Sequence, residues 1–235
     1  MKRQVDQIVS CDECKSESKV FCALSIDEKK ELSEDKGNNF YKKGQVIFYE
    51  GNHSNGLYCI YSGKVKLTKL GEDGKEQVVR FAKTGDILGY RSPLSNEPYH
   101  ATASAMSDSH ICHLSKKKFI ALMASNPKLS WNTMQVLSQD LKNAEQNLIN
   151  IAQKTVKERI AEALVLLYKT FGMAEDGLTL DIVLSRSEIA DIAGTTTETT
   201  IRTLATLNEE KLIQLKGKSI KIMDIKGLTR TASIY

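Results

Sequence analysis

The chain has 235 residues, of which 41% are hydrophobic and 26% charged, and its formal net charge at pH 7 is +4. This length and composition are typical of a globular protein with one large or two small domains, and the mild positive charge gives only weak support for a nucleic-acid partner. A membrane span is excluded because no apolar run approaches the ~18 residues that one needs, and the N-terminus lacks the apolar core of a signal peptide. We therefore expect a cytoplasmic protein without a membrane partner.

Residues 1–36 are predicted to form a cysteine-containing segment. Cys11 and Cys14 have C-x2-C spacing, Cys22 follows, and the chain holds five cysteines in all. An odd number of cysteines in a cytosolic chain argues against a disulfide framework and favours free thiols or a metal site.

Residues 37–126 have the character of a β domain. Glycines divide Phe40–Leu114 into short runs of strand-forming residues, namely QVIFY, GLYCIY, KVKLTK, QVVRFA, HATASA and HICHL. Runs of this length and spacing predict a small antiparallel barrel or jelly roll, with a hairpin turn at Glu72-Asp73-Gly74. Cys59 lies within one of these runs and is expected to be a core residue. A short helix is predicted from Lys116 to about residue 126.

A long helix is predicted over residues 127–153, with Pro127 at the first helical position, which suits proline. Apolar residues then recur at alternating spacings of three and four, a heptad pattern that a partner helix normally buries. Because the intervening residues are polar, we expect a dimerisation face; the alternative is packing against the chain's own barrel. The apolar positions are Met134, Leu137, Leu141, Ala144, Leu148 and Ile151.

Residues 154–235 are predicted to form a DNA-binding domain. A helix is expected over Lys154–Thr170, and the stretch from Leu184 to Ile213 then has the pattern of two short helices joined by a tight turn. Ser185 or Ser187 suits the N-cap of the first helix, with Glu188 in its first turn. Gly194 supplies the backbone freedom for the turn.

The second of these helices is expected to begin at Thr195 or Thr196 and to run to about Glu209. Glu198 and Arg202 are four residues apart and so share one face near its N-terminus, where a helix-turn-helix meets base edges. Arginine can bind guanine O6 and N7, and glutamate can accept from cytosine N4. The alternative is an ordinary surface ion pair. The predicted inner face is Ile201, Leu204, Ala205 and Leu207, and the predicted outer face is Thr197, Glu198, Thr200, Arg202 and Thr203.

A two-stranded ribbon with a basic tip is predicted after the second helix. Leu212–Leu215 and Ser219–Ile222 flank Lys216-Gly217-Lys218, so the two lysines would reach phosphates from the wing of a winged helix. Thr179–Ile182 can add a short strand. From residue 170 to the C-terminus there are eight Lys and Arg against nine Asp and Glu, so DNA affinity depends on where the charges lie.

Taken together, these features resemble the CRP/FNR family of bacterial transcription regulators over nearly the whole chain. The matching stretches are KKGQVIFYEG, GLYCIYSGKVKL, GDILG, VKERIAEAL and SRSEIADIAGTTTETTIRTL. The resemblance implies an α+β fold with an eight-stranded β-roll, a dimerisation helix and a winged helix-turn-helix. It also implies a homodimer on palindromic double-stranded DNA, with RNA polymerase as a further partner. The DNA-binding residues that it implies are Thr196, Thr197, Glu198, Thr200, Arg202, Thr203, Lys216 and Lys218.

The effector is not expected to be cyclic AMP. In the cyclic-AMP branch of the family a Glu binds the ribose and an Arg binds the phosphate, whereas here Tyr90 replaces the Glu and His100 stands in place of the Arg. A buried phosphate would lack its bidentate partner. The equivalent pocket would be lined by Gly89, Tyr90, Arg91, Ser92, His100, Ala101 and Thr102.

Resemblance to the FNR branch implies a different cofactor, an iron–sulfur cluster held by three N-terminal cysteines and one late in the β-roll. Cys11, Cys14, Cys22 and Cys112 are the matching residues, although seven residues separate Cys14 from Cys22, more than in the familiar pattern. Thiolates are the soft ligands that such a cluster requires. Zinc at the same cysteines and plain thiols are the alternatives.

The sequence leaves two other classes of function to consider. A winged helix can dock on protein instead of DNA, which would make the chain a ligand-binding scaffold. An enzyme has little support, because the sequence contains no nucleophile–base pair, phosphate-binding Gly-rich loop with Lys, or HExxH motif.

Overall fold

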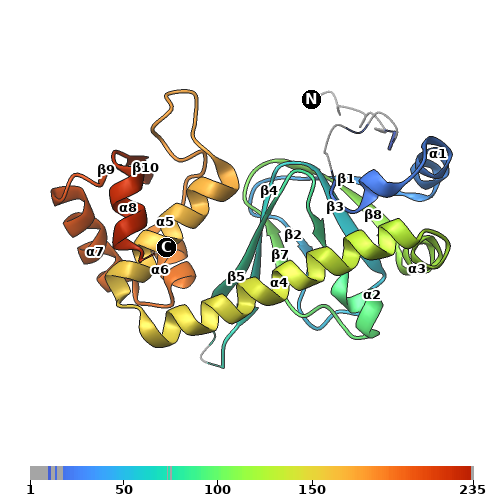
Figure 1. Cartoon of the computed structure of the whole chain (residues 1–235), viewed down its shortest axis with the longest axis horizontal. Coiled ribbons are helices and arrows are strands. Elements are labelled where there is room, and N and C mark those ends of the chain that lie inside the picture. The colour runs from blue at the N-terminus through green and yellow to red at the C-terminus, as the bar shows by residue number, and fades with distance from the viewer. Residues whose placement is uncertain (1–9, 12–13, 15–17, 73, 75, 234–235) are drawn as a thin grey trace. The chain divides into compact units, whose positions relative to one another are not determined.

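The computed structural model describes residues 10–11, 14, 18–72, 74 and 76–233 (Figure 1). These residues form two compact units. Unit 1 consists of the described residues up to Lys69 and of Val79–Leu141. Unit 2 consists of the described part of Leu70–Val78 and of the described residues from Lys142 onward. No helix of the described part is long and apolar enough to cross a bilayer.

Unit 1 is built on a β-roll of two four-stranded antiparallel sheets. One sheet has the strand order β1-β8-β3-β6 and the other β2-β7-β4-β5. All six predicted runs form strands, and β1 and β6 complete the eight. Asp73 of the predicted hairpin turn lies outside the described residues. The strands are β1 Gly37–Tyr41, β2 Val46–Phe48, β3 Gly56–Ser62, β4 Lys64–Leu70, β5 Glu76–Lys83, β6 Ile87–Leu88, β7 Thr102–Ala105 and β8 Ser109–Ser115.

The strands β3 and β8 of the β1-β8-β3-β6 sheet contribute apolar side chains to a core on each of its two faces. Alternate residues point to opposite faces of a strand. Ile60 and Ile111 therefore enter the core inside the roll, together with Phe48 and Tyr99. Leu57 points to the outer face and joins a second core, to which the helices of unit 1 contribute.

The helices of unit 1 pack against this outer face. Leu32 of α1, Phe119 and Leu122 of α3 and Leu129 of α4 are all buried in the second core. Figure 1 shows α1 and α3 beside the end of the β-roll, with the first half of α4 running along it. The elements are η1 Phe21–Ala23, α1 Ile26–Asp35, α2 Arg91–Ser95, α3 Lys116–Ser125 and α4 Pro127–Gln153.

Unit 2 contains the second half of α4 and a winged helix. The wing is the antiparallel pair β9–β10, and single bridges join Thr179 to Lys221 and Met173 to Leu180 in place of a full third strand. The predicted start of α5 at Lys154 was two residues early, because Thr155 caps the helix. The elements are α5 Val156–Phe171, α6 Arg186–Ala193, α7 Thr197–Glu209, β9 Ile213–Lys216, β10 Ser219–Ile222 and α8 Ile225–Thr231.

Candidate DNA interface and cysteine cavity

The turn between α6 and α7 is fixed at both sides. Ser185 and Glu188 form a capping box at the start of α6, and Gly194 ends the helix with a left-handed φ of 60°. Arg159 of α5 reaches this turn, where its Nε donates to the carbonyl oxygen of Ala193 at 2.8 Å and its Nη2 to that of Gly194 at 3.3 Å. One planar guanidinium thus holds the C-terminal end of α6 against α5.

The N-terminal turn of α7 is exposed and carries the predicted charged pair. Thr196 caps the helix by accepting from the backbone N–H of Thr199. Glu198 and Arg202 lie 3.5 Å apart, with 80% and 71% of their side chains exposed. An exposed pair of this kind contributes little to stability, so both side chains are available to contact bases in a major groove.

The two faces of α7 differ from the prediction at Thr200. Its side chain is fully buried, in line with the buried Leu204 and Leu207, and so it cannot reach a base edge. Ile201, which was expected to face inward, is 51% exposed, and Ala205 is exposed as well. The prediction was wrong because it assigned residues to faces by their polarity. The buried face of the helix includes Thr200 in place of Ile201, the residue that follows it. Thr203 is half-buried.

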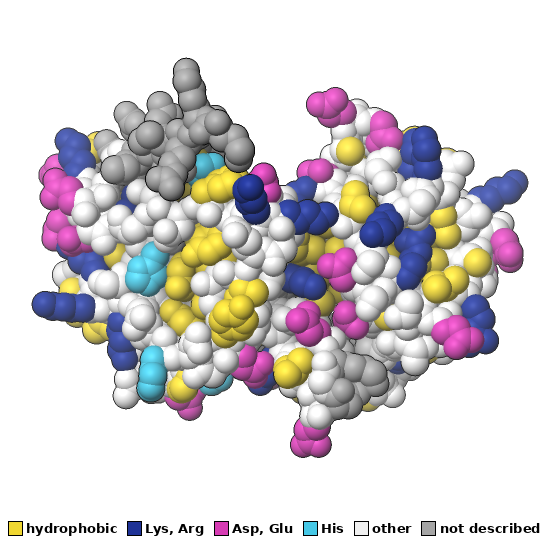
Figure 2. All heavy atoms as spheres, turned by 180° about the vertical axis from the view of Figure 1, so that it is seen from behind, with side chains coloured by type: hydrophobic (Ala, Val, Ile, Leu, Met, Phe, Trp, Pro, Cys, Tyr) yellow, Lys and Arg dark blue, Asp and Glu magenta, His cyan; other side chains and the backbone are white. Residues whose placement is uncertain are grey.

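The wing presents two lysines beside its tip. Lys216 ends β9, Gly217 takes a left-handed φ of 59°, and Lys218 follows, all three exposed. The Nη2 of Arg186 donates to the Gly217 carbonyl at 2.9 Å, which ties the tip to the start of α6. On the face drawn in Figure 2, basic and acidic side chains are interspersed, so the charge is not gathered into one large patch. The wing lysines are therefore individual candidates for phosphate contacts.

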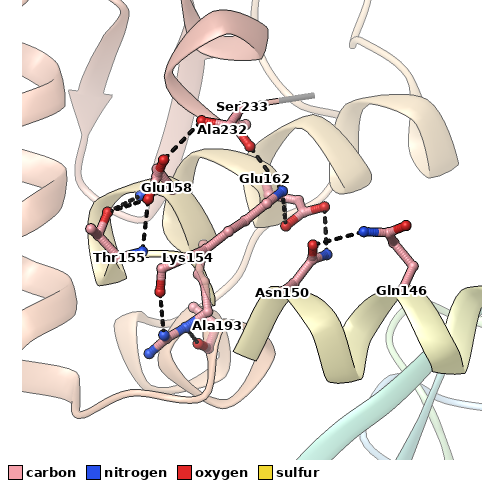
Figure 3. A network of polar contacts seen from close by, with 10 residues as sticks. Gln146, Asn150, Lys154, Thr155, Glu158, Glu162, Ala193, Ala232 and Ser233 are labelled. Atoms are coloured by element: carbon pink, nitrogen blue, oxygen red, sulfur yellow. Dashed lines mark hydrogen bonds and ion pairs between the residues drawn. The ribbon is translucent and has the colours of Figure 1, made fainter. Parts of the chain in front are cut away.

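A polar network surrounds the junction between α4 and α5 (Figure 3). Lys154 Nζ lies 2.9 Å from Glu162 Oε2 and donates to the carbonyl of Ala232 at 2.9 Å. Asn150, which is buried near the end of α4, donates to Glu162 Oε1 at 2.8 Å. The side chains of Asn150 in α4 and of Lys154 in the linker therefore meet on the Glu162 carboxylate of α5, and Lys154 connects them to the backbone after α8.

The N-terminus of α5 is capped in the same region. Glu158 accepts from the backbone N–H and the hydroxyl of Thr155 at 2.7 Å each, and from the hydroxyl of Ser233 at 2.8 Å. These hydrogen bonds, from the Thr155 hydroxyl and backbone and then from Ser233, lower the pKa of Glu158 to about 2.

The predicted dimerisation residues do not share one environment within the single chain. Leu137 is half-buried and packs against the second core of unit 1. The other five are exposed, with exposed fractions of 49% at Met134, 61% at Leu141, 70% at Leu148 and 62% at Ile151. Trp131, one turn earlier, is 59% exposed. An apolar stripe on α4 is thus uncovered in the isolated chain.

The predicted effector residues have most of their polar groups engaged within unit 1. Tyr90 is buried and its hydroxyl donates to Asp140 of α4, while Ser92 donates to the carbonyl of Pro98 at 3.0 Å. Thr102 accepts from the backbone of Glu50, and His100 Nε2 lies 2.9 Å from Glu97. Arg91 is exposed and Ala101 is buried.

Aromatic rings fill the roll next to these residues. The ring of Tyr99 stacks on Phe48 with 4.2 Å between centroids, and Phe48 also stacks on Tyr58 at 5.2 Å. Gly89 has a φ of 68°, and a Cβ added there would lie 2.8 Å from the Tyr99 ring. The close approach of this ring therefore requires glycine at position 89.

All five cysteines line one cavity of about 120 Å³ on the outer side of the β1-β8-β3-β6 sheet. We call it the cysteine cavity; it is lined by Cys11, Cys14, Cys22, Cys59, Cys112 and residues of η1, α1, β3 and β8, with Lys36. Cys59 packs against the second core, as predicted, and it also lines the cavity, which its sequence context did not indicate. Among the described residues, no three His, Cys, Asp or Glu side chains are close enough to hold a single metal ion.

Two family models match the chain. The cyclic nucleotide-binding domain matches residues 38–126, and the Crp-like helix-turn-helix domain matches residues 158–231. The two matches fall on the β-roll and on the winged helix.

Relatives and solved structures agree with these matches. A CRP-like cAMP-activated global transcriptional regulator of Mycobacterium tuberculosis is 30% identical over 193 residues, which cover 82% of this chain and 86% of that protein. The transcriptional activator protein Anr of Pseudomonas protegens is 28% identical over 186 residues, covering 78% and 75%. The crystal structure of a CRP/FNR family transcriptional regulator from Thermus thermophilus matches with a TM-score of 0.72 at 26% identity, covering 84% and 98%.

Proposed function

The chain belongs to the CRP/FNR family of DNA-binding transcription regulators, and we propose that it acts as a homodimer on palindromic operators. The observation that carries the dimer is the exposed apolar stripe on α4. Leu141, Leu148 and Ile151 are each more than 60% exposed, and exposed apolar side chains in heptad register are the kind of surface that a second helix buries. The obvious partner is a second copy of α4.

The proposed base-reading surface is the exposed face of α7. Thr197, Glu198 and Arg202 lie at its N-terminal end, where a recognition helix contacts base edges. Ile201 is exposed on the same face, and its methyl groups suit the C5-methyl group of thymine. Lys216 and Lys218 would contact phosphates, which position the protein without reading sequence.

Two measurements test this proposal together. Sedimentation should give a dimer in solution, and selection from random duplexes should enrich a site with two-fold symmetry. Leu148→Glu should convert the dimer to a monomer and weaken operator binding, whereas Glu145→Gln, at an exposed polar position of the same helix, should leave the dimer intact.

A wild-type protein that is monomeric both free and bound to DNA would contradict the proposal. The absence of any enriched sequence would favour a scaffold that docks on protein.

Cyclic AMP is not the proposed effector. In the loop where the cyclic-AMP branch places its ribose-binding Glu, the Tyr90 hydroxyl is bonded to Asp140, and aromatic rings fill the neighbouring interior. Operator affinity is therefore expected to be the same with and without saturating cyclic AMP, and a tenfold gain would overturn this part of the proposal.

A second candidate function is sensing through the cysteine cavity, for which the gathering of all five thiols is the supporting observation. The donor set fits an iron–sulfur cluster, because thiolates are its usual ligands. Cys11, Cys14 and Cys112 would hold it, with Cys22 as the fourth ligand that the family resemblance implies. When bound, the cluster supplies a redox-active group. Anaerobic reconstitution with ferrous iron and sulfide, followed by measurement of iron and acid-labile sulfide, tests this function.

A further inference from the structure

Two of the five cysteines are direct neighbours on adjacent strands. Cys59 of β3 pairs in register with Cys112 of β8. Directly opposite residues in an antiparallel pair project on the same face, with Cβ atoms about 4.5–5.5 Å apart. Here that face is the outer one, and both side chains line the cysteine cavity. The strand pairing therefore presents two thiols to the cavity from a rigid sheet.

The N-terminal C-x2-C pair reaches the same cavity from the other side. The backbone N–H of Cys11 donates to the hydroxyl of Ser33 at 2.6 Å, which attaches this residue to α1. Cys11 also packs against the second core, and Cys14 lines the cavity beside it. Four thiols thus come from two strands and one anchored segment.

Lys36 adds a positive charge to this group of four. Its side chain lines the cavity, and it interacts electrostatically with Cys112, Cys11 and Cys14. A cation here would offset the negative charge of several thiolates.

Cys22 differs from the other four cysteines. It is exposed, whereas the others are partly buried. Its thiol donates to the carbonyl of Lys19 at 3.2 Å and lies 3.8 Å from Nδ2 of Asn132. It stands at the rim of the cavity with polar partners of its own.

The size of the cavity bears on what it can hold. Its volume of about 120 Å³ is several times the ~30 Å³ that one water occupies in the liquid. A thiol-lined cavity of this size has room for more than a single ion.

We propose that Cys59, with Cys11, Cys14 and Cys112, supplies the four protein thiolates of an iron–sulfur cluster in this cavity, and that Cys22 is dispensable for holding it. This inference rests on the second candidate function above. It replaces one ligand of the set that the family resemblance implies with the residue that β3 places opposite Cys112.

The test is anaerobic reconstitution of the full chain with ferrous iron and sulfide, in the wild type and in single Cys→Ser variants. Iron and acid-labile sulfide per chain and the visible absorption spectrum are the readouts. Cys59→Ser should lose as much iron as Cys112→Ser, and the matched control Cys22→Ser should retain the wild-type amount. Circular dichroism verifies folding, and Cys59→Ala serves as a second variant that places no hydroxyl at this position.

A measurement on the unsubstituted chain keeps the test independent of folding defects. Iodoacetamide in limiting amount should modify the exposed Cys22 first, as mass spectrometry can verify, and the blocked protein should still take up the full amount of iron. Loss of iron on blocking Cys22, or in Cys22→Ser, overturns the inference and leaves the sensing function standing. Retention of iron in folded Cys59→Ser also overturns it. A wild type that takes up no iron overturns both.

Discussion

The hydroxyl of Tyr90 donates a hydrogen bond to the carboxylate of Asp140 at 2.5 Å, and so joins the end of the β-roll to α4. Arg80 of β5 reinforces this contact, because its Nη1 lies 2.9 Å from the same carboxylate oxygen and its guanidinium lies 5.8 Å from the centre of the Tyr90 ring. Tyr90 and Arg80 thus both bind the Asp140 carboxylate and connect the β-roll to α4.

We expect Tyr90→Phe to lower the free energy of unfolding by roughly 1.5–3 kcal/mol, the range for a hydrogen bond to a charged group. The variant keeps the buried ring and removes only the donor to Asp140. Urea denaturation measures the effect. Tyr49→Phe, at a side chain that is 58% exposed, is the matched control and should change stability by less than about 0.5 kcal/mol. Equal effects of the two substitutions would mean that the Tyr90–Asp140 bond contributes nothing.

Arg202→Ala and Lys218→Ala should weaken DNA binding in different ways. Loss of a base contact by Arg202 should cost roughly 1–3 kcal/mol of discrimination between the selected site and its mismatched variants. Loss of Lys218 should weaken all duplexes alike and reduce the slope of log affinity against log salt by about one. Gel-shift titrations on specific and random duplexes measure both. Equal losses on the two duplexes for Arg202→Ala would exclude base reading by this residue.

Thr200→Val should stabilise the protein by about 1 kcal/mol and leave operator binding unchanged. The hydroxyl of Thr200 is buried without a hydrogen-bond partner among the described residues, and such a group costs roughly 1–3 kcal/mol. Valine keeps the shape and removes that cost. Thr197→Val, on the exposed face of α7, is the matched variant and should alter DNA binding with little change in stability. Weaker operator binding by Thr200→Val would show that the Thr200 hydroxyl contributes to DNA binding after all.

Glu158→Gln should destabilise the protein in a pH-dependent way. The folded pKa of Glu158 is about 2, below the ~4.3 of an unperturbed glutamate, so the ionised carboxylate stabilises the fold above pH 4.3. This contribution is lost as the pH falls towards 2. The difference in free energy of unfolding between wild type and variant should therefore be full at pH 7 and shrink between about pH 5 and pH 2. Urea titrations across this range measure it, and Glu209→Gln, at an exposed residue, should show no comparable trend. A difference in free energy of unfolding that stays the same at every pH would show that the substitution acts through packing and not through the carboxylate charge.

Local signals in the sequence were sufficient for most elements. The Ser185–Glu188 capping pair, Gly194 and the ribbon around Gly217 each act within a few residues, and the structure confirms all three. The same signal would have revealed α1, because Ser25 and Glu28 also form a capping box. That helix was missed because only Leu32 is buried along it, which leaves little apolar periodicity to detect.

The error on α7 and the unforeseen place of Cys59 at the cavity have a different cause. Exposure of Ile201 and burial of Thr200 depend on how α7 is rotated against its neighbours, and residue polarity points the wrong way at both positions. The proximity of Cys59 to Cys112 depends on the pairing of β3 with β8, strands that are more than 40 residues apart in sequence. Tertiary packing determines which face of α7 is buried, and strand pairing determines which residues of β3 and β8 are neighbours. Neither can be read from local patterns in a single sequence.

The guanidinium of Arg159 has a mechanical consequence. It donates hydrogen bonds to the carbonyls of Ala193 and Gly194 and also to that of Lys154, so one side chain links the start of α5 to the turn before α7. Only Lys154 and Thr155 separate α4 from α5. A bend of a few degrees at these two residues would displace the far end of α7 more than the start of α5, because the displacement grows with distance from the bend.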